Sequence, residues 1–87
     1  MTTKNTLLNK IRYANFGQRD ALWAILKYKN IGIFRKISAM CAVFNLNLDK
    51  VIENMPQDDE GRIYDKKTRI IIHNALMEAD ERARRNE

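Results

Sequence analysis

Apolar residues recur every three or four positions along most of the chain, a spacing that predicts helices rather than strands. Polar stretches, glycines and one proline separate five such segments, which cover residues 5–16, 18–30, 33–45, 48–55 and 66–85. The third segment is apolar around most of its circumference, which is typical of a central helix. We therefore expect an all-α fold, a compact bundle of about five helices that ends in its longest helix.

Several residues indicate where these helices begin and end. Gly17 stands where a C-cap belongs, whereas Asn47 and Asp65 precede apolar runs as N-caps do. Residues 62–64 have the composition of a short extended piece, but an isolated strand has nothing to pair with. No repeat, low-complexity tract or linker interrupts the pattern, so residues 1–87 are expected to form a single helical domain.

Composition narrows the class of protein. The chain has 87 residues, of which 45% are hydrophobic and 31% charged, as expected for one folded domain. No apolar stretch approaches the roughly 20 residues of a membrane span, and the N-terminus lacks the apolar core of a signal peptide. The single cysteine, Cys41, excludes an internal disulfide and a cysteine-based zinc site. We expect a soluble cytoplasmic protein with no metal and no cofactor.

Charge is distributed unevenly along the chain. The net charge is +5, yet residues 1–48 carry +7 and residues 49–87 carry −2. An excess of positive charge on the first three helices favours a polyanionic partner, although it also serves solubility alone. In the last helix each of three acids precedes an arginine by four residues, which predicts the ion pairs Glu78–Arg82, Asp80–Arg84 and Glu81–Arg85.

Arg19, Trp23 and Lys27 form a row along one face of the second helix, because they are four residues apart. A wheel places Trp23 opposite the apolar face, so its ring is a candidate for stacking on an unpaired base while the cations hold phosphates. The alternative is that Trp23 packs beneath another helix, such as the long C-terminal one.

A second candidate is the start of the third helix. Arg35 and Lys36 oppose the helix dipole there, and with the backbone N–H groups after Gly32 they predict a phosphate site. The alternative is that both side chains project into solvent. The short link between the second and third helices is also compatible with a helix-turn-helix pair. Residues 37–53 resemble the closing helices of phage-repressor-like domains, although small residues do not fall in the usual register around Gly32.

Catalytic constellations are not apparent in the sequence. It contains no glycine-rich phosphate loop, no paired carboxylate motif and no Ser/His/Asp order. His73 is expected on the surface, Cys41 as an inert buried thiol, and the acids at 58–60 in a solvated turn. We therefore expect no enzymatic activity.

The leading hypothesis is a small basic regulator that binds DNA or RNA. Its expected contact residues are Arg12, Arg19, Trp23, Lys27, Lys29, Arg35 and Lys36. The alternative is a protein-binding effector, such as an inhibitor, an antitoxin-like factor or an adaptor, that docks on an acidic protein. A homodimer is a further expectation, because Ile70, Ile71 and Ile72 cover more of the last helix than one intramolecular face needs.

Overall fold

A computed structural model describes residues 6–85 and contains five helices in that range. They are α1 (Thr6–Arg12), α2 (Phe16–Lys27), α3 (Ile33–Phe44), α4 (Leu48–Glu53) and α5 (Asp65–Arg85). The only strand-like pairing among these residues is an isolated antiparallel bridge between Gln57 and Ile63. The predicted all-α bundle with a long C-terminal helix is thereby confirmed.

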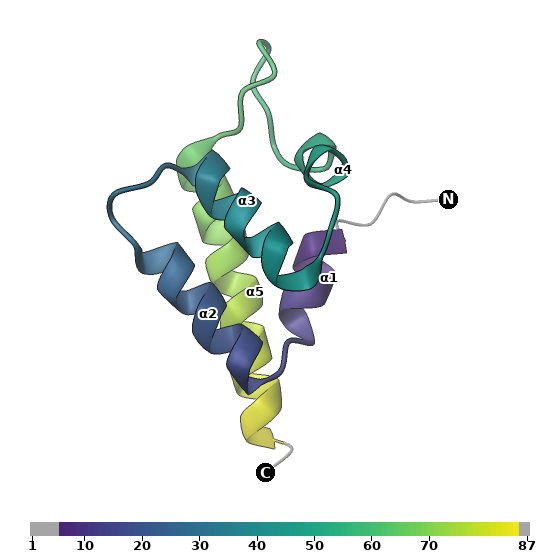
Figure 1. Cartoon of the computed structure of the whole chain (residues 1–87), viewed down its shortest axis with the longest axis vertical. Coiled ribbons are helices and arrows are strands. Elements are labelled where there is room, and N and C mark those ends of the chain that lie inside the picture. The colour runs from purple at the N-terminus through teal and green to yellow at the C-terminus, as the bar shows by residue number, and fades with distance from the viewer. Residues whose placement is uncertain (1–5, 86–87) are drawn as a thin grey trace.

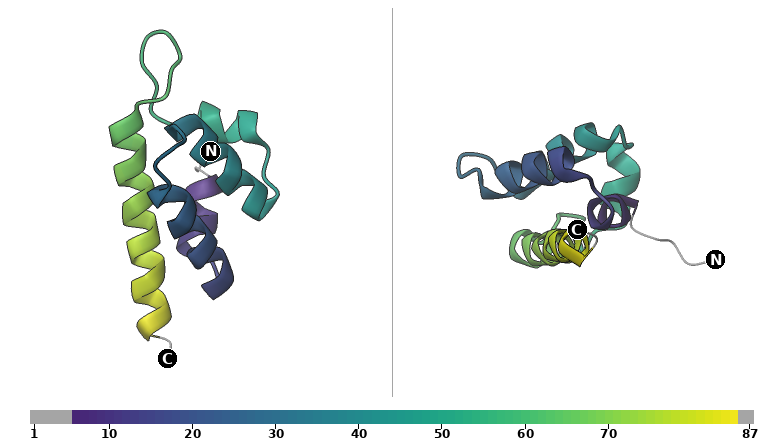
Figure 2. Two further views of the ribbon diagram at one scale, coloured as in Figure 1. Left: turned by 60° about the vertical axis from the view of Figure 1, so that its left-hand side comes forward. Right: turned by 90° about the horizontal axis from the view of Figure 1, so that it is seen from below.

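Helix α5 runs along one side of the molecule, and the shorter helices cover its inner face (Figure 1; Figure 2, left). Ile72 and Leu76 of α5 are fully buried against this layer. The facing side chains are apolar and also inaccessible to solvent: Leu7 and Ile11 from α1, Leu22 from α2, and Ile37 and Met40 from α3. Burial of these side chains holds together helices that are mostly too short to be stable alone.

The boundary predicted at Gly17 is wrong, because Gly17 lies in the first turn of α2. Asn15 is the N-cap of that helix, and its side-chain oxygen accepts a hydrogen bond from the Gln18 N–H at 2.8 Å. The Gln18 side chain accepts in return from the Asn15 N–H at 3.0 Å. This reciprocal capping box starts α2 and leaves α1 to end at Arg12.

The N-cap at Asn47 is confirmed, since its side chain accepts from the Lys50 N–H at 3.2 Å. Asp65 is instead the first residue of α5, and its carboxylate pairs with Arg69 at 2.7 Å.

The loop between α4 and α5 projects from the top of the molecule in Figure 1. Asp58 organises it by accepting hydrogen bonds from the backbone N–H groups of Glu60 and Arg62, both at 2.9 Å. The Arg62 backbone N–H is the main reason that the pKa of Asp58 lies below its usual range. The short extended piece here is paired, contrary to expectation, because Gln57 of the same loop lies opposite Ile63.

Two of the three ion pairs predicted within α5 are wrong. Glu81 does pair with Arg85, at 3.1 Å, but the other two acids reach neighbouring helices. Glu78 pairs with Arg12 of α1 and Asp80 with Arg19 of α2, each at 3.1 Å. The sequence spacing could not reveal these pairs, because α1 and α2 bring their arginines alongside α5 only in the folded chain.

Candidate nucleic-acid interface

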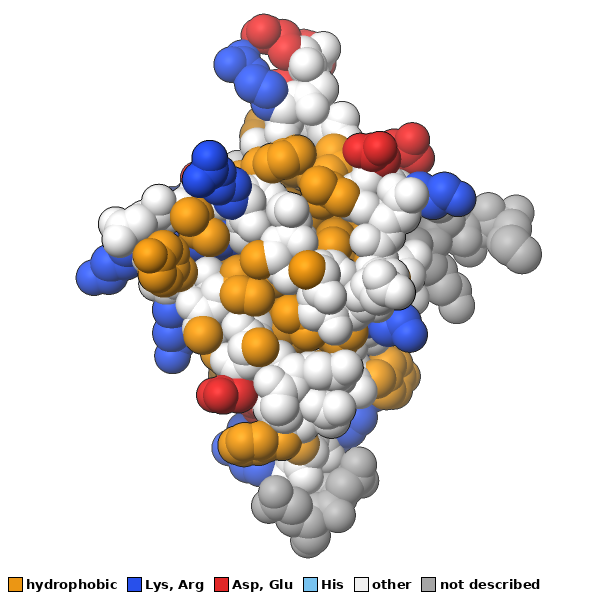
Figure 3. Space-filling model, viewed as in Figure 1, with side chains coloured by type: hydrophobic (Ala, Val, Ile, Leu, Met, Phe, Trp, Pro, Cys, Tyr) orange, Lys and Arg blue, Asp and Glu red, His pale blue; other side chains and the backbone are white. Residues whose placement is uncertain are grey.

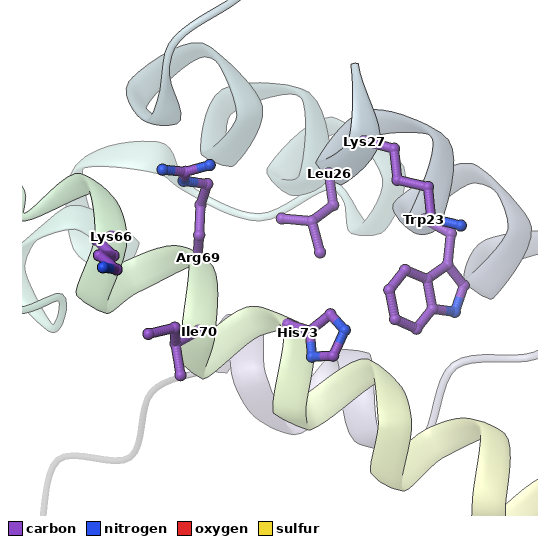
Figure 4. Close-up of a pocket in the computed structure, with 7 residues that line it drawn as sticks. All are labelled: Trp23, Leu26, Lys27, Lys66, Arg69, Ile70 and His73. Carbon is purple, nitrogen blue, oxygen red and sulfur yellow. The ribbon is translucent and has the colours of Figure 1, made fainter. Parts of the chain in front are cut away.

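A groove of about 410 Å³ lies between α2 and the N-terminal half of α5. Figure 4 shows its lining side chains, and Figure 2 (right) shows the two helices side by side from below. The lining residues come from both helices: Trp23, Leu26 and Lys27 from α2, and Lys66, Arg69, Ile70 and His73 from α5. The groove therefore combines three cationic side chains with an apolar floor, by which we mean Trp23, Leu26 and Ile70. None of the seven lining residues is acidic.

The groove continues past the end of α2 into a second hollow. The two hollows share Leu26, Lys27 and Arg69, and the second adds Lys29 from the following loop. In Figure 3, Lys and Arg side chains gather along the left edge of the molecule, over the end of α2 and this loop. Asp65 is the one acid that lines the second hollow, and it is paired with Arg69.

Trp23 is half-buried and is held from several sides. Its indole N–H donates to Asp80 Oδ2 at 2.9 Å. The ring of His73 meets it edge-on, with centroids 5.2 Å apart and planes at 81°, and Lys27 Nζ lies 5.3 Å from the ring centroid. The expectation that Trp23 faces away from the core is wrong, and the alternative of packing against the C-terminal helix is confirmed. Helix α2 contacts both α3 and α5, so it has two covered faces where a wheel assumes one.

Arg19 belongs to the same contact rather than to the groove. Its guanidinium donates to Asp80 Oδ1 at 3.1 Å and to the Ala14 carbonyl at 3.0 Å. Only 16% of its side chain is exposed, so its charge is paired within the fold. Arg19, Trp23 and Lys27 do lie in a row along α2, as predicted. The Arg19 guanidinium, however, is bonded to other residues of the fold.

At the start of α3, where a phosphate site is predicted, the Lys36 side chain is engaged within the fold. Lys36 is buried, and its Nζ donates to the Leu26 carbonyl near the C-terminal end of α2. This bond satisfies one of the carbonyls that every helix end leaves open, and it ties α3 to α2. Arg35 is exposed, so neither the phosphate site nor the alternative of two solvated side chains describes both residues.

Arg12 lies outside the groove, at the contact of α1 with α5, where it pairs with Glu78 and donates to Asn9. Of the seven predicted contact residues, Trp23 and Lys27 line the groove, and Lys27, Lys29 and Lys36 line its continuation, where Lys36 is bonded to the Leu26 carbonyl. His73 is exposed, as expected, but it lies against Trp23.

Sequence reasoning missed the contribution of α5 to this groove. Lys66, Arg69 and Ile70 lie far from Trp23 in sequence, within the half of the chain whose net charge is negative. The only available signal was their helical spacing, which places Lys66 and Ile70 on one face with His73.

Comparisons with protein-family models, with curated proteins and with solved structures gave no match for this chain. Across residues 6–85 no helix is long and apolar enough to cross a membrane. The same residues contain no cluster of three or more His, Cys, Asp or Glu side chains that could hold a metal ion. Burial raises the pKa of the Cys41 thiol, which keeps it in its less reactive protonated form.

Proposed function

We propose that this protein binds nucleic acid, with the groove between α2 and α5 as its contact surface. The observation that carries the proposal is the grouping of Lys27, Lys66 and Arg69 around Trp23, without an acid among the residues that line the groove. Such a combination of cations and an aromatic ring suits phosphates and bases together.

Phosphates would be held by exposed cations whose present contacts are weak. Lys27, Lys29 and Lys66 are exposed on the rim of the groove and its continuation. Arg69 is paired with Asp65, but half of the Arg69 side chain and 58% of the Asp65 side chain remain exposed. An exposed pair of this kind contributes about 1 kcal/mol at most, so a phosphate can compete for the guanidinium.

A base would lie on the apolar floor. Trp23 is fixed by Asp80 and His73, so little conformational entropy is lost when a ligand packs against it. Lys27 now lies over the ring, and its flexible side chain can move to a phosphate as a base takes its place. This arrangement favours single strands, in which unpaired bases are accessible.

The apolar floor also supports a second candidate, an acidic protein partner. Trp23, Leu26 and Ile70 would receive an apolar anchor, and the surrounding cations would pair with acidic side chains. Its test is recovery of a stoichiometric protein partner from nuclease-treated lysate, with Trp23→Ala as the variant that should lose it.

The nucleic-acid proposal is tested by fluorescence anisotropy with single-stranded RNA, single-stranded DNA and duplex DNA over a range of salt concentrations. Contact of four phosphates by Lys27, Lys29, Lys66 and Arg69 predicts a log–log slope of about −3 for single strands. Lys66→Ala should reduce the magnitude of this slope by about 0.7. Lys50→Ala is the matched control, because Lys50 is an exposed lysine on α4 and lies outside the groove.

Intrinsic fluorescence gives an independent readout, since Trp23 is the only tryptophan in the chain. Quenching on addition of a single strand is expected if a base packs against the ring. Undetectable binding at about 50 mM salt, where phosphate contacts are strong, would overturn the proposal. A slope equally affected by Lys66→Ala and Lys50→Ala would move the contact surface away from the groove.

A further inference from the structure

The outward face of α5 carries an apolar stripe that the described chain leaves exposed. Ile70 and Met77 are two helical turns apart on this face and retain 51% and 46% of their accessible surface. The opposite face holds Ile72, Leu76 and Ala79, which are buried in the core. In Figure 2 (left) α5 forms an outer edge of the molecule, with the other helices on its inner side.

Two residues of opposite charge flank this stripe at equal distances from its centre. Lys66 precedes Ile70 by four residues, and Glu81 follows Met77 by four. All four side chains share one face, because separations of four and seven residues return to nearly the same angle. When the helix is turned end for end about the point between His73 and Asn74, Ile70 falls on Met77 and Lys66 falls on Glu81.

We propose that a second copy of this chain packs on this face, with the two α5 helices antiparallel about a two-fold axis beside His73 and Asn74. Each Lys66 then meets Glu81 of the other copy, and each Ile70 meets Met77 of the other copy. A two-fold interface of this kind uses the same patch on both copies and closes without further association. A parallel pairing is disfavoured because it would place Lys66 against Lys66 and Glu81 against Glu81.

The present contacts of these side chains are compatible with the pairing. Glu81 is bonded to Arg85 within α5, but 59% of the Glu81 side chain is exposed, so this pair is weak and exchangeable. Ile70 and Met77 gain the most from association, since each would bury about half of its surface.

Lys66 and Ile70 belong both to this face and to the lining of the groove between α2 and α5. A second copy on this face therefore covers part of the groove, so dimer formation and the binding of a strand compete for these two side chains. This consequence rests on the proposed function, whereas the dimer itself does not.

Sedimentation velocity of the full chain over a wide concentration range tests the dimer. We expect the mass to rise from one chain to two, with no larger species. Lys66→Glu or Glu81→Lys alone should weaken association by roughly tenfold or more, because each change turns two attractive pairs into two repulsive ones. The double variant Lys66→Glu/Glu81→Lys should restore association to within about threefold of the parent, because the charges are exchanged across the axis.

Lys50→Glu makes the same change in net charge on α4 and should leave association unchanged. A single species of monomer mass at every concentration would overturn the proposal. Failure of the double variant to recover association would also overturn it, because recovery depends on the antiparallel register. Glu81 does not line the groove, so Glu81→Lys separates loss of the dimer from loss of nucleic-acid binding.

Discussion

Replacement of Asp80 by alanine should destabilise the fold more than replacement of any comparable acid on α5. One carboxylate oxygen of Asp80 accepts from Trp23 at 2.9 Å, and the other accepts from Arg19 at 3.1 Å. Asp80→Ala removes both bonds at once and leaves a largely buried guanidinium with the Ala14 carbonyl as its remaining acceptor.

The expected cost follows from these contacts. A hydrogen bond to a charged group contributes about 1.5 kcal/mol at the lower end of the usual range, which suits a carboxylate that is 36% exposed. Two such bonds give about 3 kcal/mol, and the better helix propensity of alanine returns up to about 0.7 kcal/mol. The net loss of about 2 kcal/mol should lower the melting temperature of a domain of this size by roughly 8–16 °C.

Thermal melts followed by circular dichroism measure this loss, with Glu78→Ala as the matched control. Glu78 is also an acid on α5 paired with an arginine of another helix, but 55% of its side chain is exposed and it accepts from Arg12 alone. The control should lose at most about 1 kcal/mol. If Asp80→Ala lowers the melting temperature no further than Glu78→Ala does, the assignment of Asp80 as the main polar contact between α2 and α5 is refuted.

Three further predictions concern other parts of the chain. Lys36→Ala should lower the free energy of unfolding by about 2 kcal/mol in a thermal melt, because the buried part of the side chain and its bond to the Leu26 carbonyl are lost. Nucleic-acid affinity should stay within about twofold, and a smaller salt slope would contradict this expectation. Asn15→Ala should cost about 1 kcal/mol through loss of the α2 capping box, and an unchanged melting temperature would argue against that role. The Asp58 carboxyl should titrate by NMR below its ordinary 3.8, so its contribution to stability is present at neutral pH and is lost as the pH falls through the lowered pKa; a midpoint at or above 3.8 would oppose this.

Helix content was predictable because burial is the main local constraint on this chain. Residues such as Ile72 and Leu76 recur at the helical period, and the same residues are fully buried in the structure. Helix ends were less predictable where two signals compete. Gly17 has the composition of a C-cap, but the reciprocal bonds of Asn15 and Gln18 start the next helix one residue earlier.

Only the residues that α2 contributes to the candidate site can be predicted from the sequence. Trp23 and Lys27 share a face of α2 by their spacing alone, whereas Lys66 and Arg69 join them through the packing of α5 on α2. The same dependence on helix packing explains why the sequence predicts Arg19 as a ligand-binding residue. Its partner Asp80 is remote in sequence, so no local pattern distinguishes a paired cation from an available one.

Folding brings charged residues from the two sides of residue 48 together. Arg12, from the basic half, is paired with an acid of α5, whereas Lys27 faces the groove beside cations of α5. Affinity for a polyanion should therefore depend on which cation is removed and not on net charge. Arg12→Gln and Lys27→Gln change the net charge equally, yet only Lys27→Gln should weaken binding of a single strand, by about one phosphate contact in the salt slope. Equal losses in the same anisotropy titration would mean that the positive charge acts as a diffuse field, and the groove would lose its special role.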